Sequence, residues 1–408
     1  MAPYESYKDS GVKWLGKIPS HWDILPGKAI FEENKTKNTT NRETFVLSLS
    51  YGNIIPKLDI NEGLVPENYS GYQIVEPGYI IIRCTDLQND KVSLRTGHVN
   101  HHGIISGAYL GLKVKRGVSS RYMHYLLHNW DVSKELYRYG SGLRQSLSWA
   151  DIKYLLLALP PMDEQEVIVA YLDKVTGDID RAIEAQQKMI DALNERKQII
   201  ITRAVTRGLN PDAPLRDSGI DWLGQIPEHW EIIPMRYLCK MKTGDKDTIM
   251  RDDNGKYPFY VRSPHIEHIN TYSYDGEAVL MAGDGVGAGK VFHYVNGKFD
   301  YHQRVYNFHQ FKRITGEFLY FYLKCNFRYK IEEGGAKSTV DSVRLPWLKA
   351  FPICVMPKDE QQSIVEHIHK STGPIDCALS NCERMISLLQ ERKQIIINEV
   401  VTGKTKVI

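Results

Sequence analysis

A glycine-rich segment, GDGVGA at Gly283–Ala288, matches the G-x-G-x-x-A spacing of dinucleotide-binding loops. In such loops the backbone approaches a pyrophosphate, and the helix that follows presents its amino terminus to the phosphates. Here the following residues, KVFHYVNGKF, have the character of a strand with a turn. We therefore expect a turn between strands, of a kind that can approach a DNA backbone, and no cofactor loop.

Two histidine-rich segments could supply metal ligands: His101-His102 and His265-Ile266-Glu267-His268. Neither has the HExxH spacing or a third ligand nearby, so we expect loop histidines and no metal site. The sequence also lacks a G-x-S-x-G elbow, and Leu159-Pro160-Pro161-Met162 lacks the amide of the Asn/Asp-Pro-Pro-aromatic motif of amino-methyltransferases. We expect no catalytic residues in this chain.

Basic, amide and aromatic side chains on turn-rich stretches have the chemistry to contact DNA phosphates and base edges. The candidates in the first half of the chain are Lys35, Lys37, Arg42, Arg95, Arg144 and Gln145. Those in the second half are Lys246, Arg251, Lys256, Tyr257, Arg262, Lys290 and Arg304. The charge balance supports this choice, because residues 27–158 and 235–354 carry net charges of +4 and +5 while residues 159–234 carry −6.

Two internal repeats organise the chain that must position these residues. SGVKWLGKIPSHW at Ser10–Trp22 returns as SGIDWLGQIPEHW at Ser218–Trp230, an offset of 208. A second block, from Asp163-Glu164-Gln165 to ERKQIII, returns 196 residues later at Asp359-Glu360-Gln361. Repeated and unrepeated blocks therefore alternate, and we expect domains at 1–158 and 209–354 with helical spacers at 159–208 and 355–408. The short β-rich runs of the unrepeated blocks predict mixed α+β domains.

Each spacer carries apolar residues at alternating intervals of four and three, which predicts a long helix with a heptad seam. The predicted interface residues are Ile179, Ile183, Ile190, Leu193 and Ile200, with their counterparts Ile375, Leu379, Ile386, Leu389 and Ile396. Gly177 and Gly373 interrupt the pattern, so we expect a short helix before each long one. The matched seams favour an antiparallel pair, and the alternative is two separate helices that each pack on their own domain.

The targeting and cysteine patterns bound the location of the protein. The amino terminus has no signal-peptide pattern, and no apolar run reaches the length of a membrane span. Six cysteines are scattered without a C-x-x-C pair, which is typical of a reducing compartment. We expect a cytoplasmic protein without a membrane contact.

Taken together, the twice-repeated WLG-x-IP-x-HW opening, the Asp-Glu-Gln segments after Pro161 and Pro357, and the twin ERKQIII helices resemble the specificity subunit of a type I restriction-modification enzyme. The resemblance covers nearly the full length. It implies two target-recognition domains, separated by an antiparallel helix pair, that each read one half of a split double-stranded DNA target.

The same resemblance implies the partners and their cofactors. It implies two methyltransferase subunits, which would bind S-adenosylmethionine, and restriction/translocase subunits, which would bind ATP and Mg. No cofactor or metal is expected on this chain itself. Two other classes stay open: a coiled-coil scaffold without sequence-specific DNA recognition, and a nuclease with an unrecognised site.

Overall fold

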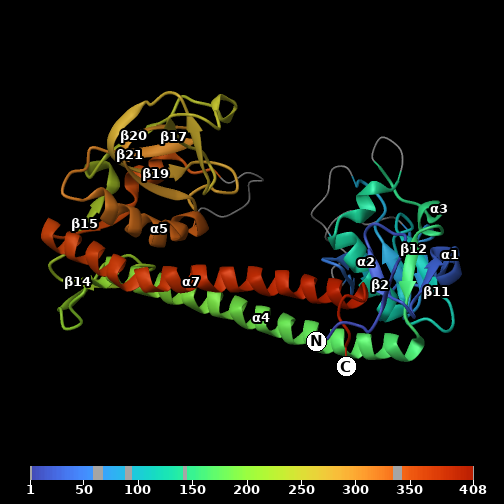
Figure 1. The fold of residues 1–408 in the computed structure, drawn as a ribbon. Helices are drawn as coiled ribbons and strands as arrows, with labels where there is room; N and C mark the ends of the chain where they lie inside the picture. The colour runs from blue at the N-terminus through green and yellow to red at the C-terminus, as the bar shows by residue number, and fades with distance from the viewer. Residues whose placement is uncertain (1, 58–67, 88–93, 141–144, 334–341, 408) are drawn as a thin grey trace. The chain divides into compact units, whose positions relative to one another are not determined.

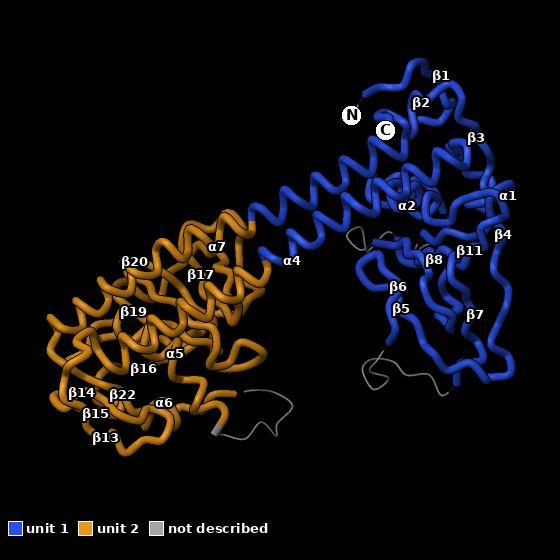
Figure 2. Tube along the Cα trace, turned by 90° about the horizontal axis from the view of Figure 1, so that it is seen from below, with its two compact units in different colours: residues 1–186, 384–408 blue, residues 187–383 orange. Residues whose placement is uncertain are grey.

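The computed structural model describes residues 2–57, 68–87, 94–140, 145–333 and 342–407. The chain divides into two compact units, residues 1–186 with 384–408 (unit 1) and residues 187–383 (unit 2), which Figure 2 colours separately. Each unit contains one unrepeated block, one repeated opening and half of each of two long helices. The fold has the mixed α+β composition that the sequence predicts.

The two repeated spacers form the long helices α4 (Met162–Arg207) and α7 (Lys358–Val401), which lie side by side in Figure 1. The expected short helix before each is wrong, because α4 continues through Gly177, and α7 continues through Gly373 and Pro374. Helical glycine and proline cost about 1 and 3 kcal/mol. Packing of the neighbouring Ile375, which is 7% exposed, helps to offset that cost.

Contacts inside each unit show that the helices run antiparallel. In unit 1, Ile168 and Leu172 of α4 share a core with Ile397, Val400 and Val401 of α7, and Asp180 of α4 pairs with Lys393 of α7. In unit 2 the carboxyl-terminal half of α4 and the amino-terminal half of α7 share a core in the same way. All ten predicted interface residues are buried or half-buried.

Unit 1 is built from several small antiparallel sheets. One sheet has the order β4-β11-β8-β9, and the others are the pairs β1-β2, β3-β12, β5-β6 and β10-β7. The strands are β1 (Tyr7–Asp9), β2 (Lys17–Pro19), β3 (Asp23–Pro26), β4 (Phe31–Glu33), β5 (Leu47–Ser50), β6 (Asn53–Pro56), β7 (Gln73–Val75), β8 (Ile80–Ile82), β9 (Thr96–His98), β10 (Gly103–Ile105), β11 (Leu110–Val114) and β12 (Leu156–Leu159). The helices are α1 (Gly27–Ile30), α2 (Ser120–Val132) and α3 (Trp149–Ile152), with a 3₁₀ turn η1 (Glu135–Arg138).

Unit 2 concentrates its strands in one six-stranded sheet of order β16-β21-β19-β20-β17-β18, beside the pairs β13-β14 and β15-β22. The strands are β13 (Leu215–Asp217), β14 (Gln225–Pro227), β15 (Glu231–Pro234), β16 (Lys240–Thr243), β17 (Tyr257–Tyr260), β18 (Ile266–Ile269), β19 (Tyr274–Ala282), β20 (Phe292–Tyr301), β21 (Val305–His309) and β22 (Pro352–Val355). The helices are α5 (Gly316–Glu333) and α6 (Leu345–Ala350), with 3₁₀ turns η2 (Met235–Tyr237) and η3 (Thr248–Met250).

Candidate nucleic-acid interface and its supporting frame

A pair of antiparallel strands closes each unrepeated block, which we call a variable block because its sequence differs between the two halves of the chain. β3 pairs with β12, with Ile24 opposite Ala158, and β15 pairs with β22, with Ile232 opposite Cys354. The first strand of each pair follows the repeated opening, and the second leads into the long helix. The repeated residues therefore bring the beginning and the end of each variable block together.

The glutamate of each Asp-Glu-Gln segment holds the repeated opening against the long helix. His21 Nε2 lies 2.8 Å from Glu164 Oε2, and His229 Nε2 lies 2.8 Å from Glu360 Oε2. The other Glu360 oxygen accepts a hydrogen bond of 3.0 Å from Trp230 Nε1. In unit 1 the hydroxyl of Tyr4 bonds the corresponding oxygen of Glu164. The two repeats therefore share the histidine–glutamate contact. The residue that contacts the second glutamate oxygen differs, being Tyr4 in unit 1 and Trp230 in unit 2.

The glutamine of each segment is buried and reaches into the variable block. Gln165 Oε1 accepts from the backbone N–H of Ser119 at 2.9 Å, and Gln361 Oε1 accepts from that of Thr315 at 2.8 Å. Ser119 is the N-cap of α2, and Thr315 immediately precedes α5. Each amide nitrogen donates to a nearby carbonyl, of Pro160 and of Met356. One glutamine therefore fixes the start of a packed helix in each unit.

Two of the predicted DNA contacts in unit 2 meet at Asp284 of the GDGVGA segment. The guanidinium of Arg262 lies 3.1 Å from Asp284 Oδ1, and that of Arg304 lies 3.5 Å from Asp284 Oδ2. A third predicted contact, Lys246, lies next to this cluster in the fold, because its backbone carbonyl accepts a hydrogen bond of 2.8 Å from the N–H of Gln303, the residue before Arg304. The side chains of Arg262 and Arg304 are 47% and 64% exposed, so Asp284 orients both without covering them.

His302 supports this cluster from beneath. Burial and the nearby Arg262 lower the pKa of His302, which favours a neutral ring. Its Nδ1 accepts a hydrogen bond of 3.0 Å from the backbone N–H of Arg304. The side-chain amide of Gln303 donates a hydrogen bond of 2.9 Å to Asp247 Oδ2. A cavity of about 440 Å³ opens beside them, lined by Thr243, Gly244, Gly283, Asp284, Gln303, Arg304, Tyr306, Ser342 and Val343.

The glycines of the GDGVGA segment allow close packing against the two arginine-bearing segments. A Cβ at Gly283 would lie 2.9 Å from the carbonyl oxygen of Arg304, and one at Gly287 would lie 2.5 Å from that of Arg262. The segment connects strand β19 to strand β20, so the predicted turn between strands is confirmed. Val286 is 91% exposed.

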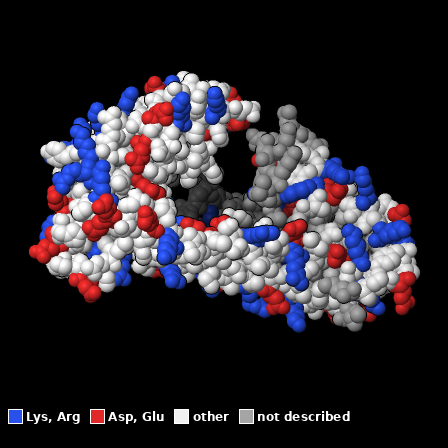
Figure 3. All heavy atoms as spheres, turned by 60° about the vertical axis from the view of Figure 1, so that its left-hand side comes forward, with Lys and Arg blue, Asp and Glu red and all other residues white. Residues whose placement is uncertain are grey.

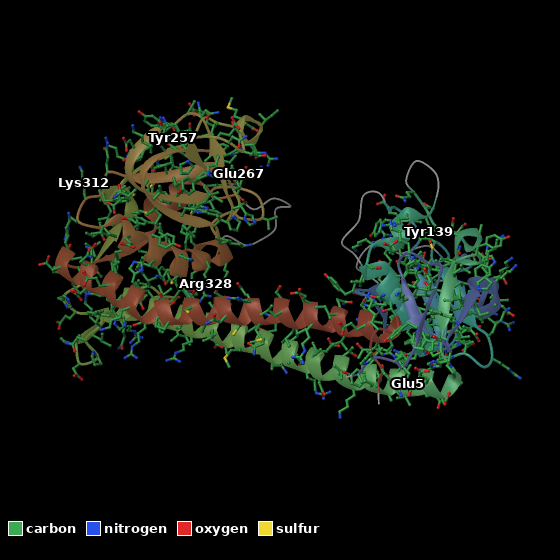
Figure 4. The ribbon with its side chains drawn as sticks, viewed as in Figure 1. Glu5, Tyr139, Tyr257, Glu267, Lys312 and Arg328 are labelled. Atoms are coloured by element: carbon green, nitrogen blue, oxygen red, sulfur yellow. The ribbon has the colours of Figure 1, made fainter. Side chains whose placement is uncertain are left out.

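Other predicted contacts in unit 2 lie outside this cluster. Lys256 places its ammonium 5.6 Å from the ring centre of Tyr257, and Arg251 lies 3.7 Å from Glu267. Figure 4 shows Tyr257 on the side of unit 2 away from α7. Lys290 is exposed just before β20.

The predicted contacts in unit 1 have mixed outcomes. Lys35, Lys37 and Arg42 are exposed, whereas Arg95 is fully buried. The Arg95 guanidinium donates to the carbonyls of residues 83, 85 and 86 and to the Tyr137 hydroxyl. The prediction of a DNA contact at Arg95 is therefore wrong, because its donors are used inside the fold. Gln145 donates to the carbonyls of residues 137 and 139, and Arg144 lies outside the described residues.

The histidine segments have structural contacts. His102 lies 2.9 Å from both Glu43 and Glu76, and hydrogen bonds to Glu76 and Glu43 raise the pKa of His102. Within the described ranges, no group of three or more His, Cys, Asp and Glu residues is arranged to hold a metal ion. No helix in the part of the chain that the structure describes is long and apolar enough to cross a membrane.

Sequence reasoning missed the supporting residues. Asp284, His302 and Gln303 were not among the candidates, although Asp284 lies inside the noted glycine segment. The contact between His21 and Glu164 could have been predicted, because both residues recur in the second copies of their blocks, as His229 and Glu360. Lys and Arg are interspersed with Asp and Glu over the visible surface in Figure 3. Local clusters are therefore a better guide to the interface than net charge.

Comparison with known proteins matches both the sequence and the fold. Residues 227–376 match the model of the type I restriction modification DNA specificity domain. The chain is 28% identical over 181 residues to the type I restriction enzyme EcoDI specificity subunit of Escherichia coli, an alignment that covers 44% of this chain and 40% of that protein. It is 24% identical over 332 residues to the type I restriction enzyme MjaVIII specificity subunit of Methanocaldococcus jannaschii, covering 75% of each.

The fold is also found among solved structures. A chain from a study of complex assembly and conformational transition of the type I R-M system superposes with a TM-score of 0.68 and 16% identity. The superposition covers 94% of this chain and 98% of that one. The domain match and the relatives make this chain similar to the specificity subunits of type I restriction-modification enzymes, and the solved chain shares its fold.

Proposed function

We propose that this chain recognises a bipartite double-stranded DNA target, with one variable block for each half-site, and docks methyltransferase subunits. The observation that carries the proposal is a supporting frame that is built twice, around two different variable blocks. The frame consists of the repeated opening and the start of the long helix, joined by the glutamate and glutamine contacts described above. His21–Glu164 and His229–Glu360 have the same geometry, whereas the sheets they support differ. Equivalent surfaces suit two copies of one partner, and different reading surfaces suit two different half-sites.

The cluster around Asp284 has the chemistry to read the second half-site. Arginine is the side chain that most often contacts guanine, through the O6 and N7 atoms in the major groove. Arg262 and Arg304 are held by one carboxylate and stay exposed. A carboxylate that orients both guanidinium groups reduces the conformational freedom lost when they bind.

The chemistry of methylation and cleavage lies on the partners under this proposal. The methyltransferase subunits would bind S-adenosylmethionine, and the restriction/translocase subunits would bind ATP and Mg. The chain alone would neither methylate nor cleave DNA. The complex would work in the cytoplasm, where its DNA substrate lies.

Co-expression with the methyltransferase subunit, followed by single-molecule sequencing of methylated bases, tests the proposal. The wild-type chain should direct methylation to one split sequence. Arg304→Ala should lower affinity for that sequence roughly tenfold to a hundredfold and relax the base preference in one half-site only. Arg313→Ala is the control, because Arg313 is similarly exposed but pairs with Glu231 at the frame. Methylation without sequence preference, or changes in both half-sites, would contradict the two-reader arrangement.

A further inference from the structure

The β5–β6 hairpin of unit 1 ends in a turn whose sequence neither turn propensity nor packing explains. Ser50 pairs with Asn53, so Tyr51 and Gly52 form a two-residue loop. Both have positive φ, 46° for Tyr51 and 79° for Gly52, as a type I′ turn requires. Such turns favour Asn or Gly at the first position, and a bulky residue with positive φ is strained.

Among the residues that the structure describes, none packs closely on the Tyr51 ring to compensate for this conformation. Its side chain is 90% exposed, although it is an aromatic residue. An uncompensated backbone strain combined with an exposed aromatic ring is the pattern expected of a binding residue. The Tyr51 ring at this turn is therefore in a position to contact a binding partner outside the chain.

The inner face of the hairpin is firmly anchored. Leu47 and Ile54 are 2% and 5% exposed and belong to one hydrophobic cluster, against which Leu49 packs. Gly97 of β9 allows this approach, because a Cβ there would lie 2.7 Å from Leu49 and 2.8 Å from Ile54. The hairpin is thus held by its buried face, while Tyr51 at its tip is exposed.

The outer face carries side chains suited to base edges. Ser48 lies opposite Ile55, and Ser50 lies opposite Asn53, so these four side chains share the face away from the cluster. Serine and asparagine can donate to and accept from bases, and an apolar side chain can contact the methyl group of thymine. Ile55 is 45% exposed.

We propose that the β5–β6 hairpin is the element that enters the major groove at the first half-site, with Tyr51 packing against the bases at its tip. This inference rests on the proposed function. A two-stranded ribbon fits the width of the major groove. Lys37 and Arg42, both exposed, precede the hairpin in the chain and suit the flanking phosphates.

The test uses the full chain in complex with the methyltransferase subunits and a fluorescent duplex that carries the wild-type methylated sequence. Tyr51→Asn creates the Asn-Gly pair that this turn favours, so its melting temperature should equal or exceed that of the wild type. Its affinity should fall about tenfold, because an aromatic contact with a base is lost. Tyr51→Phe keeps the ring and should bind within about threefold of the wild type.

Tyr154→Asn is the matched control. Tyr154 is 64% exposed in the same unit and lies beside Lys28 and Lys153 instead of at a hairpin tip. It should leave the affinity unchanged. Methylation mapping of Tyr51→Asn should show relaxed preference in the first half-site alone.

The outcomes separate this inference from the function on which it rests. A specific wild-type complex with unchanged affinity and motif in Tyr51→Asn overturns the role of the hairpin and leaves the proposed function standing. A changed second half-site overturns it as well. A wild-type complex without sequence preference overturns both.

Discussion

The two units carry equivalent frames but build their variable blocks by different means. Unit 2 uses one six-stranded sheet, whose strands β19 and β20 have 9 and 10 residues. Aromatic rings pack on this sheet: Phe299 is fully buried, and its ring centre lies 5.6 Å from that of Tyr260. The strands of the unit 1 block have three to five residues each and form separate small sheets. Short sheets bury less apolar surface per strand and need other ties.

Buried polar side chains supply those ties in unit 1. Gln73 on β7 donates to the carbonyls of Ser106 and Tyr109 at 3.1 and 2.8 Å and accepts from Asn34 at 3.2 Å. Arg95 similarly links the end of β8 to Tyr137. The unit 1 block is therefore held by hydrogen bonds between its segments.

The shared frame shows how two such different blocks fit one scaffold. The buried glutamines contact backbone groups of the blocks, the N–H groups of Ser119 and Thr315. A backbone group is present whatever side chain follows it. The frame therefore constrains where a helix begins and leaves the reading surface free to change.

Arg95→Leu should have the largest effect, because it breaks the polar ties of unit 1 only. Four carbonyl and hydroxyl acceptors would lose their donor, and removing one member of a buried charged network costs about 3–5 kcal/mol. Urea denaturation should show this loss. Hydrogen exchange should place it in unit 1 and leave unit 2 protected.

Arg42→Leu is the matched control, since Arg42 is exposed in the same unit. It should change the free energy of unfolding by less than about 0.5 kcal/mol. Equal stability of the Arg95 and Arg42 variants would mean that buried polar ties do not distinguish unit 1 from unit 2.

The buried glutamines should give the next largest effects, and their ratio tests the frame. Gln361 donates to the carbonyls of Arg313 and Met356 and accepts from Thr315, whereas among the described residues Gln165 donates to the carbonyl of Pro160 and accepts from Ser119. Gln361→Leu should cost about 3 kcal/mol and Gln165→Leu about 2 kcal/mol, because buried partners are left unpaired. Urea midpoints of the two variants measure the difference.

Gln362→Leu serves as control for this pair. Gln362 is exposed, and its side-chain amide donates to Glu366, one turn along the same helix. A loss in Gln362→Leu as large as in Gln361→Leu would show that helix propensity, and not the buried contact, accounts for the effect.

The frame could be predicted from sequence more fully than the reading surface. Heptad spacing and the repeat offsets located both long helices, since those patterns depend on local periodicity. The break expected at Gly177 failed because packing in a helix pair outweighs a propensity cost of about 1 kcal/mol. Arg95 was misjudged because its residue type gives no sign of burial. Tyr51 was missed because its significance lies in a backbone angle.

The smallest predicted effects concern the two ion pairs between the helices, and they test how closely the halves match. Lys393 pairs with Asp180, and Lys197 pairs with Asp376, 196 residues away in each case from its counterpart. The lysines are similarly half-buried, with side chains 25% and 29% exposed. Equivalent surroundings should give equivalent coupling, about 0.5–1 kcal/mol for each pair.

Charge reversal separates this coupling from the effect of each residue alone. Lys393→Asp should destabilise the fold, and adding Asp180→Lys should restore most of the loss. Lys197→Asp with Asp376→Lys should give the same coupling within about 0.3 kcal/mol. Thermal unfolding of both double-mutant cycles measures the two values, and 1 M salt should weaken both, because the ion pairs remain accessible to solvent. Unequal couplings would mean that the repeated helices are alike in sequence period but differ in their electrostatic surroundings, so the frame would be equivalent only at its glutamines and glutamates.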